Sequence, residues 1–366
     1  MSFEEMIERH TDIVMREKNS SGRPVIGTLC SYVPVEILHS LGVIPMRLWG
    51  QADDLHEADA LLQSYICPPV RHLMAMGLEG RYDFLDGIVH CYTCDATCGL
   101  FNIWVRNLEP GFSHMVSIPY VSIDEALEYA VAEFRILIDK LESFTQNEFS
   151  GDALENAIAL YGEVRSHMLE VYGLKAGGLP ISYSEVYSMN VCSQVLPVEM
   201  MVKHLEEYLE EAKRKEPDGG RGRRILLTGS VITDIPLMAF IEDAGCNIVA
   251  DDTCLGLRLL GEPMPGGGDP LERLASWYMA RPPCASRADF PSRKRYMLDT
   301  LEAFEITAVV FAHQKFCDPH LSDYPFLKGV LEEAGVPSLH LEMEEEGFAG
   351  RAQTRLESFF EMLETG

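Results

Sequence analysis

Short apolar runs alternate with amphipathic helical stretches along most of the chain. The runs are rich in β-branched residues, which is typical of strands that are buried on both faces of a parallel sheet. They lie at 24–30, 43–49, 84–90, 114–118, 224–229, 247–250, 306–311 and 338–341. The alternation predicts an α/β protein with doubly wound, parallel sheets.

The predicted helices fall into two series with a long helical stretch between them. After a helical start, shorter helices are expected at 34–41, 58–64, 70–77, 235–244, 271–280, 293–304 and 326–334. The stretch from 124 to about 215 is helical, with breaks near Gly151 and at 177–180. We therefore predict an N-terminal α/β domain at 1–120, a helical bridging region at 121–216 and a C-terminal α/β domain at 217–366. A linker is expected at 217–220.

The charge balance argues against polyanionic partners. The formal net charge is -27, from 57 acidic and 30 basic residues, whereas nucleic-acid binders usually present a basic face. We expect no nucleic-acid partner and no membrane partner. The first residues lack the basic and apolar segments of a secretory signal, so a cytoplasmic location is expected.

Ten cysteines in a reducing compartment indicate metal binding, catalysis or packing rather than disulfides. Cys91, Cys94 and Cys98 follow the predicted strand at 84–90 in a C-x2-C-x3-C spacing. Such spacing occurs at zinc sites, in dithiol redox centres and around iron-sulfur clusters. Cys317 likewise follows a predicted strand, and open α/β sheets bind ligands beyond the carboxyl ends of their strands. Cys192 and Cys246 are expected to be small buried packing residues.

A series of short motifs resembles the 2-hydroxyacyl-CoA dehydratase and benzoyl-CoA reductase subunit family. The motifs are GTLCSYVPVE at 27–36, GVIPMR at 42–47, ICP at 66–68, DFLDG at 83–87, TCD at 93–95, DDTCLGLR at 251–258, DPLERLA at 269–275, RPPC at 281–284, FCD at 316–318 and QTRLE at 353–357. Each motif alone is weak, but this many in one order, over nearly the whole chain, are specific.

The resemblance implies two flavodoxin-like domains and a [4Fe-4S] cluster held by Cys67, Cys94 and Cys317. Three thiolates would leave one iron open to a substrate oxygen. The implied reaction is a radical dehydration. A separate ATP-dependent iron-sulfur activator supplies one electron, and a 2-hydroxyacyl-CoA then loses water by way of a ketyl radical. The implied partners are this acyl-CoA, the activator and a homologous second subunit, or a second copy, with the present chain most similar to the smaller subunit.

Three alternatives stay open beside the dehydratase. The first is a benzoyl-CoA reductase subunit, in which the acceptor is an aromatic acyl-CoA. The second is a double-cubane cluster protein, which would use more cysteines; Cys30, Cys91, Cys98, Cys254 and Cys284 are further candidates. The third is a non-catalytic subunit that relays electrons or supports a catalytic partner.

Four further residues are candidates for the site. Glu36, in the first resembling motif, and His313, after a predicted strand, are expected to act in catalysis. Arg71 and Arg258 are expected to bind anionic groups of the CoA thioester, because a guanidinium suits phosphate. For His313 the alternative is a structural hydrogen bond, and for both arginines it is an ordinary ion pair. No Walker or Rossmann fingerprint occurs, so ATP binding by this chain is not expected.

Overall fold

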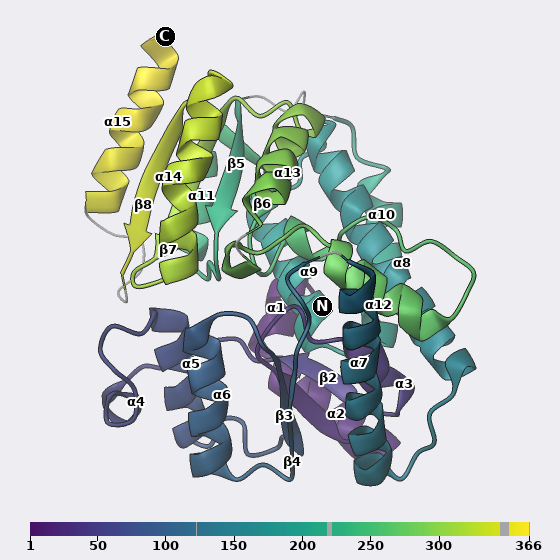
Figure 1. Cartoon of the computed structure of the whole chain (residues 1–366). Helices are drawn as coiled ribbons and strands as arrows, with labels where there is room; N and C mark the ends of the chain where they lie inside the picture. Colours follow the sequence, from purple (N-terminus) through teal and green to yellow (C-terminus); the bar gives the residue numbers. More distant parts are fainter. Residues whose placement is uncertain (122, 218–221, 288, 345–350, 366) are drawn as a thin grey trace. The chain divides into compact units, whose positions relative to one another are not determined.

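The structure is a computed structural model that describes residues 1–121, 123–217, 222–287, 289–344 and 351–365 (Figure 1). Of the linker predicted at 217–220, residues 218–220 lie outside the described residues. The chain divides into two compact units. The first unit comprises Met1–His167, Val191–Glu206 and Gly261–Arg281, and the second comprises Met168–Asn190, Glu207–Leu260 and Pro282–Gly366. The predicted boundaries at 120 and 216 stay a prediction.

The described part of the first unit contains a four-stranded parallel sheet in the order β2-β1-β3-β4. Its strands are β1 (Val25–Thr28), β2 (Ile44–Arg47), β3 (Gly87–Cys91) and β4 (Phe112–Val116). Every residue of β1, β2 and β3 is buried, whereas burial alternates along the edge strand β4. The continuous apolar runs of the sequence are therefore strands covered on both faces.

Helices cover both faces of this first sheet. α5 (Pro68–Leu78) packs against α6 (Asp95–Leu108) on one face, and α3 (Val35–Ser40) packs against α7 (Asp124–Thr145) on the other (Figure 1). α12 (Pro270–Ala280) returns from late in the chain to pack against α7. The remaining short helices of the unit are α1 (Phe3–Glu8), α2 (His10–Ser21) and α4 (His56–Asp59).

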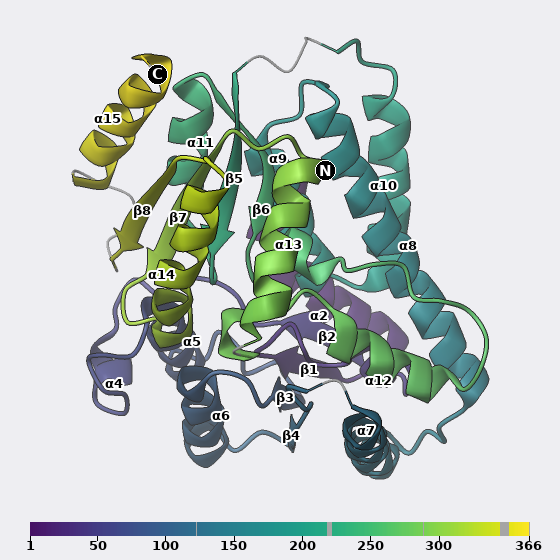
Figure 2. The same cartoon turned by 45° about the horizontal axis from the view of Figure 1, so that its top comes forward.

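The described part of the second unit contains another four-stranded parallel sheet, in the order β6-β5-β7-β8. Its strands are β5 (Arg223–Gly229), β6 (Cys246–Asp252), β7 (Ala308–Gln314) and β8 (Ser338–Met343). α13 (Phe290–Ala303) and α14 (Asp318–Glu333) pack together on one face, and α11 (Ile235–Asp243) lies on the other (Figure 2). α15 (Arg351–Thr365) packs against β8, and the short 3-10 helices are η1 (Leu257–Leu259) and η2 (Ala285–Arg287).

The helical middle region consists of α7, α8 (Gly151–Ala176), α9 (Tyr183–Val195) and α10 (Val198–Ala212). The predicted breaks near Gly151 and at 177–180 are confirmed. A further break, between α9 and α10, falls at Pro197, whose ring removes a backbone donor. The predicted α/β fold with two parallel sheets and a helical middle is thus confirmed.

Some local predictions were wrong. Cys91 is the last residue of β3 rather than a residue beyond the strand. α14 begins at Asp318 and not near 326, because Pro319 occupies the first turn, where its missing N–H costs nothing. The helix predicted at 58–64 is the shorter α4, and α6 and α15 were not predicted from the sequence.

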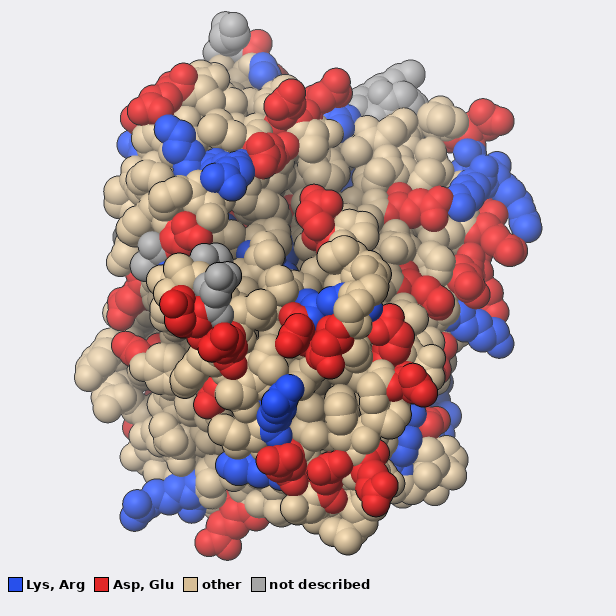
Figure 3. Space-filling view, turned by 45° about the vertical axis from the view of Figure 1, so that its right-hand side comes forward, with Lys and Arg blue, Asp and Glu red and all other residues tan. Residues whose placement is uncertain are grey.

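The surface carries the acidic excess of the sequence. On the face shown in Figure 3, acidic side chains are spread widely, with basic side chains scattered between them. Within the described residues, no helix combines the length and the apolar composition that crossing a bilayer would need.

Candidate functional site

Each sheet has a point at its carboxyl edge where the chain leaves neighbouring strands in opposite directions. In the first unit this point lies between β1 and β3, and in the second it lies between β5 and β7. Ligands of open α/β proteins bind at such points. At the first edge the Thr93 hydroxyl donates to the Cys30 sulfur at 3.4 Å. At the second edge the Gln314 side chain donates to the Val231 carbonyl at 2.8 Å.

The three cysteines expected to hold a cluster share one structural position. Cys67 is the N-cap of α5, Cys94 that of α6 and Cys317 that of α14. All three are half-buried. The positive end of a helix favours a thiolate, which is the form that binds metal. The donor chemistry of these residues therefore fits an iron-sulfur cluster. Cys67 and Cys94 belong to the first unit and Cys317 to the second.

The other cysteines of the first unit are more enclosed. Cys91 is buried in β3, and the sulfur of buried Cys98 lies 3.6 Å from Nε2 of His90. Burial raises the pKa of Cys98, and burial with the charge of Arg47 lowers the pKa of His90 to about 3. Both groups are therefore neutral near pH 7. Cys192, in the same unit, and Cys246, in the second, are buried as expected, and burial raises their pKa values to about 12 and about 11.

The second unit brings together a set that the sequence did not predict. The ligand atoms of Cys254, Cys284 and His320 lie within 4.8 Å of one another. A hydrogen bond with Cys254 lowers the pKa of Cys284 well below its ordinary value, and burial opposes this effect. His320 was not among the predicted site residues, because the helix that carries it, α14, was predicted to begin later. A correct start would have placed His320 in the first turn, three residues after Cys317.

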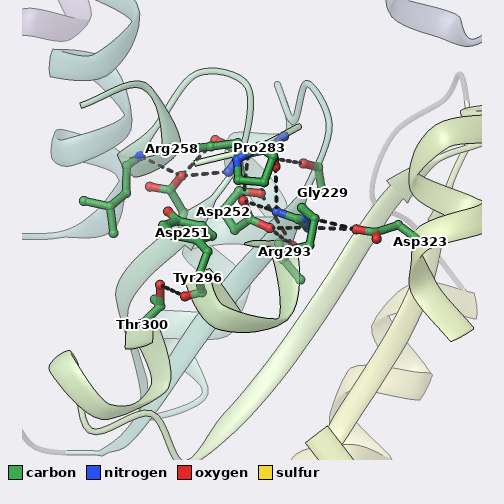
Figure 4. A network of polar contacts seen from close by, with 12 residues as sticks. Gly229, Asp251, Asp252, Arg258, Pro283, Arg293, Tyr296, Thr300 and Asp323 are labelled. Carbon is green, nitrogen blue, oxygen red and sulfur yellow. Dashed lines mark hydrogen bonds and ion pairs between the residues drawn. The ribbon is translucent and has the colours of Figure 1, made fainter. Parts of the chain in front are cut away.

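The same unit contains a buried network of ion pairs (Figure 4). Arg258 donates to Asp252 at 2.7 Å, and Arg293 donates to the other oxygen of Asp252 at 2.8 Å. Arg293 also donates to Asp323 of α14 at 2.9 Å. Burial raises the pKa of Asp252, but the two guanidinium groups outweigh it and hold the pKa below the ordinary range. Asp252 is therefore charged, and it fixes both arginines.

The neighbouring Asp251 organises the loop that follows β6. Its Oδ1 accepts hydrogen bonds from the backbone N–H and hydroxyl of Thr253 and from the N–H of Leu257. Its Oδ2 accepts from the Tyr172 hydroxyl. A Cβ at Gly256 would lie only 1.8 Å from Oδ1, so this position admits glycine alone. The loop between β6 and η1 is thus wrapped around one carboxylate.

The structure places the predicted catalytic residues in buried settings. The Glu36 carboxylate, in the first unit, accepts from Arg165 at 2.7 Å and from the Tyr278 hydroxyl at 2.8 Å. His313, in the second unit, lies at the end of β7 with its ring 5.6 Å from that of His320. Burial, followed by the neighbouring histidines, lowers the pKa of His313, so its ring is neutral.

The two arginines expected to bind CoA already have carboxylate partners. Arg71 donates to Asp59 at 2.6 Å, and Arg258 is the partner of Asp252 described above. A third buried arginine was not among the predicted site residues. Arg47 ends β2 and is only 8% exposed, and its Nη1, like Nη1 of Arg258, finds no hydrogen-bond partner among the described residues. The sequence signal for Arg47 was its position as the last residue of the GVIPMR motif at 42–47.

Comparisons with known proteins agree over nearly the whole chain. A family model described as 2-hydroxyglutaryl-CoA dehydratase, D-component, matches residues 30–363. The beta subunit of (R)-phenyllactyl-CoA dehydratase from Clostridium sporogenes is 26% identical over 99% of this chain and 97% of its own length. One of the subunits of benzoyl-CoA reductase from Thauera aromatica is 30% identical over 86% of this chain and 84% of its own length. The beta subunit of lactoyl-CoA dehydratase from Anaerotignum propionicum is 28% identical over 94% of this chain and 93% of its own length.

Proposed function

Because the chain belongs to the 2-hydroxyglutaryl-CoA dehydratase D-component family, we propose that it is an iron-sulfur subunit of a 2-hydroxyacyl-CoA dehydratase. Membership confirms the resemblance seen in the sequence motifs. The dehydratase assignment is supported by the two dehydratase beta subunits, which align over nearly their full lengths. Their names also support a second subunit as partner of this chain.

The single observation that carries the cofactor proposal is the shared position of three cysteines. In the proposal, Cys67, Cys94 and Cys317 hold a [4Fe-4S] cluster, and each does so from the N-terminus of a helix. The helix ends stabilise the thiolates electrostatically, which favours binding of a soft metal group. The cluster, when bound, supplies one-electron chemistry and an iron with an open position.

The chain's own residues would bind the acyl-CoA and keep water away from it. Arg71 and Arg258 remain proposed contacts for anionic groups, although each would have to share its guanidinium with its present carboxylate. Arg47 is a third proposed contact, and Arg47 and Arg258 each have a buried Nη1 without a hydrogen-bond partner among the described residues, which an anionic group could take. Neutral His313 can donate or accept one hydrogen bond, and Glu36 would position neighbouring groups through Arg165 and Tyr278.

A benzoyl-CoA reductase subunit is the second candidate. The observation that favours it is the 30% identity to the benzoyl-CoA reductase chain of Thauera aromatica, although over a smaller part of both chains. Turnover separates the two candidates. The chain, its partner subunit and the activator are assayed anaerobically with a series of 2-hydroxyacyl-CoA thioesters and with benzoyl-CoA. Dehydration supports the first candidate, and reduction of the aromatic ring supports the second. If neither product forms, the result favours a relay or scaffold subunit.

Cys94→Ser tests the cluster proposal. We expect the anaerobically purified variant to lose about four iron atoms per chain, together with the electron paramagnetic resonance signal of the reduced cluster. Cys192→Ser is the matched control, because Cys192 is buried in α9 and its high pKa disfavours metal binding. Full retention of iron in Cys94→Ser would contradict the proposed ligand set.

A further inference from the structure

Three side chains of the second unit, none of them a proposed cluster ligand, lie together and are of types that can bind a metal ion. Cys254 follows β6, Cys284 precedes η2, and His320 lies in the first turn of α14. Their ligand atoms all lie within 4.8 Å of one another. Two thiols and an imidazole are the donors that Zn²⁺ and similar borderline-soft cations prefer. We propose that Cys254, Cys284 and His320 bind one such divalent cation, independently of the proposed dehydratase function.

The position of Cys254 is fixed by the backbone around it. Its N–H donates to the Ser230 carbonyl at 2.9 Å, which ties the loop to the end of β5. The same loop is wrapped around the Asp251 carboxylate, where Gly256 leaves room for the oxygen. The Cys254 sulfur therefore needs no large rearrangement to meet a cation.

Arg293 links the two segments that carry Cys284 and His320. It donates to the Pro283 carbonyl at 3.3 Å, directly before Cys284, and to Asp323 at 2.9 Å. Asp323 follows His320 by three residues on α14, so both side chains project from the same side of the helix. Asp252 holds Arg293 in turn (Figure 4). The loop after β6, the segment before η2 and the start of α14 are thus held in one arrangement by buried ion pairs.

His320 supplies an observation that points to a ligand. The residue is 3% exposed, and its Nε2 has no hydrogen-bond partner among the described residues. A buried polar atom without a partner destabilises the folded chain. Coordination of a cation through Nε2 would give this atom a partner. The two cysteines are half-buried, so a cation can reach them.

The charges also balance. Two thiolates neutralise a divalent cation, so that the bound group adds no net charge beside the ion pairs of Asp252. Three protein ligands leave one of the four tetrahedral positions for water or another small donor, as in zinc sites that act on a bound molecule.

Cobalt titration of the full-length protein tests the site. Tetrahedral Co²⁺ bound to thiolates gives strong sulfur-to-metal absorption, and Zn²⁺ displaces it. The starting protein is a variant with Cys67, Cys94 and Cys317 all replaced by Ser, which removes the proposed cluster ligands. We expect it to bind about one Co²⁺ per chain with this absorption. Adding Cys284→Ser leaves one thiol, so it should lower the sulfur absorption per bound Co²⁺ and weaken binding at least about tenfold.

His320→Gln in the same starting protein provides a second measurement. It leaves both thiols in place, and we expect binding to weaken at least about tenfold while the sulfur absorption persists at high Co²⁺. Circular dichroism verifies that each variant is folded. Co²⁺ binding that is unchanged by both Cys284→Ser and His320→Gln would overturn the proposal. Iron and sulfide in equal amounts in the starting protein would also overturn it, in favour of a second iron-sulfur cluster.

Discussion

The two units bury a carboxylate in different ways. In the first unit, Glu36 is fully buried and meets one guanidinium, that of Arg165, and one tyrosine hydroxyl. In the second, Asp252 meets two guanidinium groups, and one of these also meets Asp323. The Arg165 side chain is 15% exposed and stacks on Trp277, whereas that of Arg293 is 1% exposed.

The two units also differ in what fixes the positions of their cysteines. In the first unit, Cys67 and Cys94 are placed by the helices that begin after them, and the ion pair of Glu36 joins other segments, namely α3, α8 and α12. In the second unit, the network around Asp252 directly holds the segments that carry the cysteines. A buried ion pair is weak evidence for stability, but it can specify one arrangement of the chain. We expect the second unit to depend on its buried charges more strongly.

Neutralising each carboxylate tests the comparison. Asp252→Asn removes the negative charge that two buried guanidinium groups share. We expect it to lower the free energy of unfolding by about 3–5 kcal/mol. Glu36→Gln keeps an acceptor for Tyr278 and leaves one partly exposed cation, and we expect a loss of about 1.5–3 kcal/mol. Urea unfolding is followed by circular dichroism for both units and by tryptophan fluorescence for the first unit, which contains Trp49, Trp104 and Trp277. An equal or greater loss for Glu36→Gln would break the comparison.

The pH dependence of the first unit provides a test of intermediate size. Burial, with the nearby Lys140 ammonium, lowers the pKa of His114 from 6.5 to about 4. Between these values the unfolded chain binds a proton that the folded chain does not. The contribution to stability is therefore complete above pH 6.5 and is lost as the pH falls to 4, at about 1.4 kcal/mol per pH unit.

His114→Gln should flatten this part of the stability curve by about that slope, because glutamine can accept from Lys140 without titrating. Unfolding is measured by tryptophan fluorescence at several pH values between 4 and 7. His56→Gln is the control, since His56 lies exposed in α4 of the same unit, and it should leave the curve unchanged. A slope that persists in His114→Gln would assign the loss to other groups.

The sequence revealed the layers of the fold more completely than the contacts at the site. Buried strands such as β1 and β3 appear as apolar runs because each is covered on both faces, and this is a local property. The network of Asp252 is not local, since its partners Arg293 and Asp323 lie far along the chain. Nothing in the sequence around any one of them specifies the others.

The candidate ligands show the same limit. Cys67, Cys94 and Cys317 were candidates because each stands in a short motif that resembles the family, although only the helix after Cys67 was predicted near its observed start. Cys254, Cys284 and His320 come together only through folding of three separate loops or helix ends. Asp318–Pro319 was a signal for an early start of α14, since proline favours the first helical turn. That start would have placed His320 in the first turn of the helix, close to Cys317.

The smallest expected effect tests whether the two units unfold separately. Gly162 in α8 and Gly329 in α14 both have open space where a Cβ would be, so alanine fits at each. Each replacement should stabilise its helix by about 0.5–1 kcal/mol, because alanine loses less backbone freedom on folding. If the units unfold independently, Gly162→Ala shifts the tryptophan transition to higher urea and Gly329→Ala shifts only the circular dichroism. A tryptophan shift with both variants would show that the charges around Asp252 and those around Glu36 stabilise one cooperative structure, and the contrast between the units would then concern geometry alone.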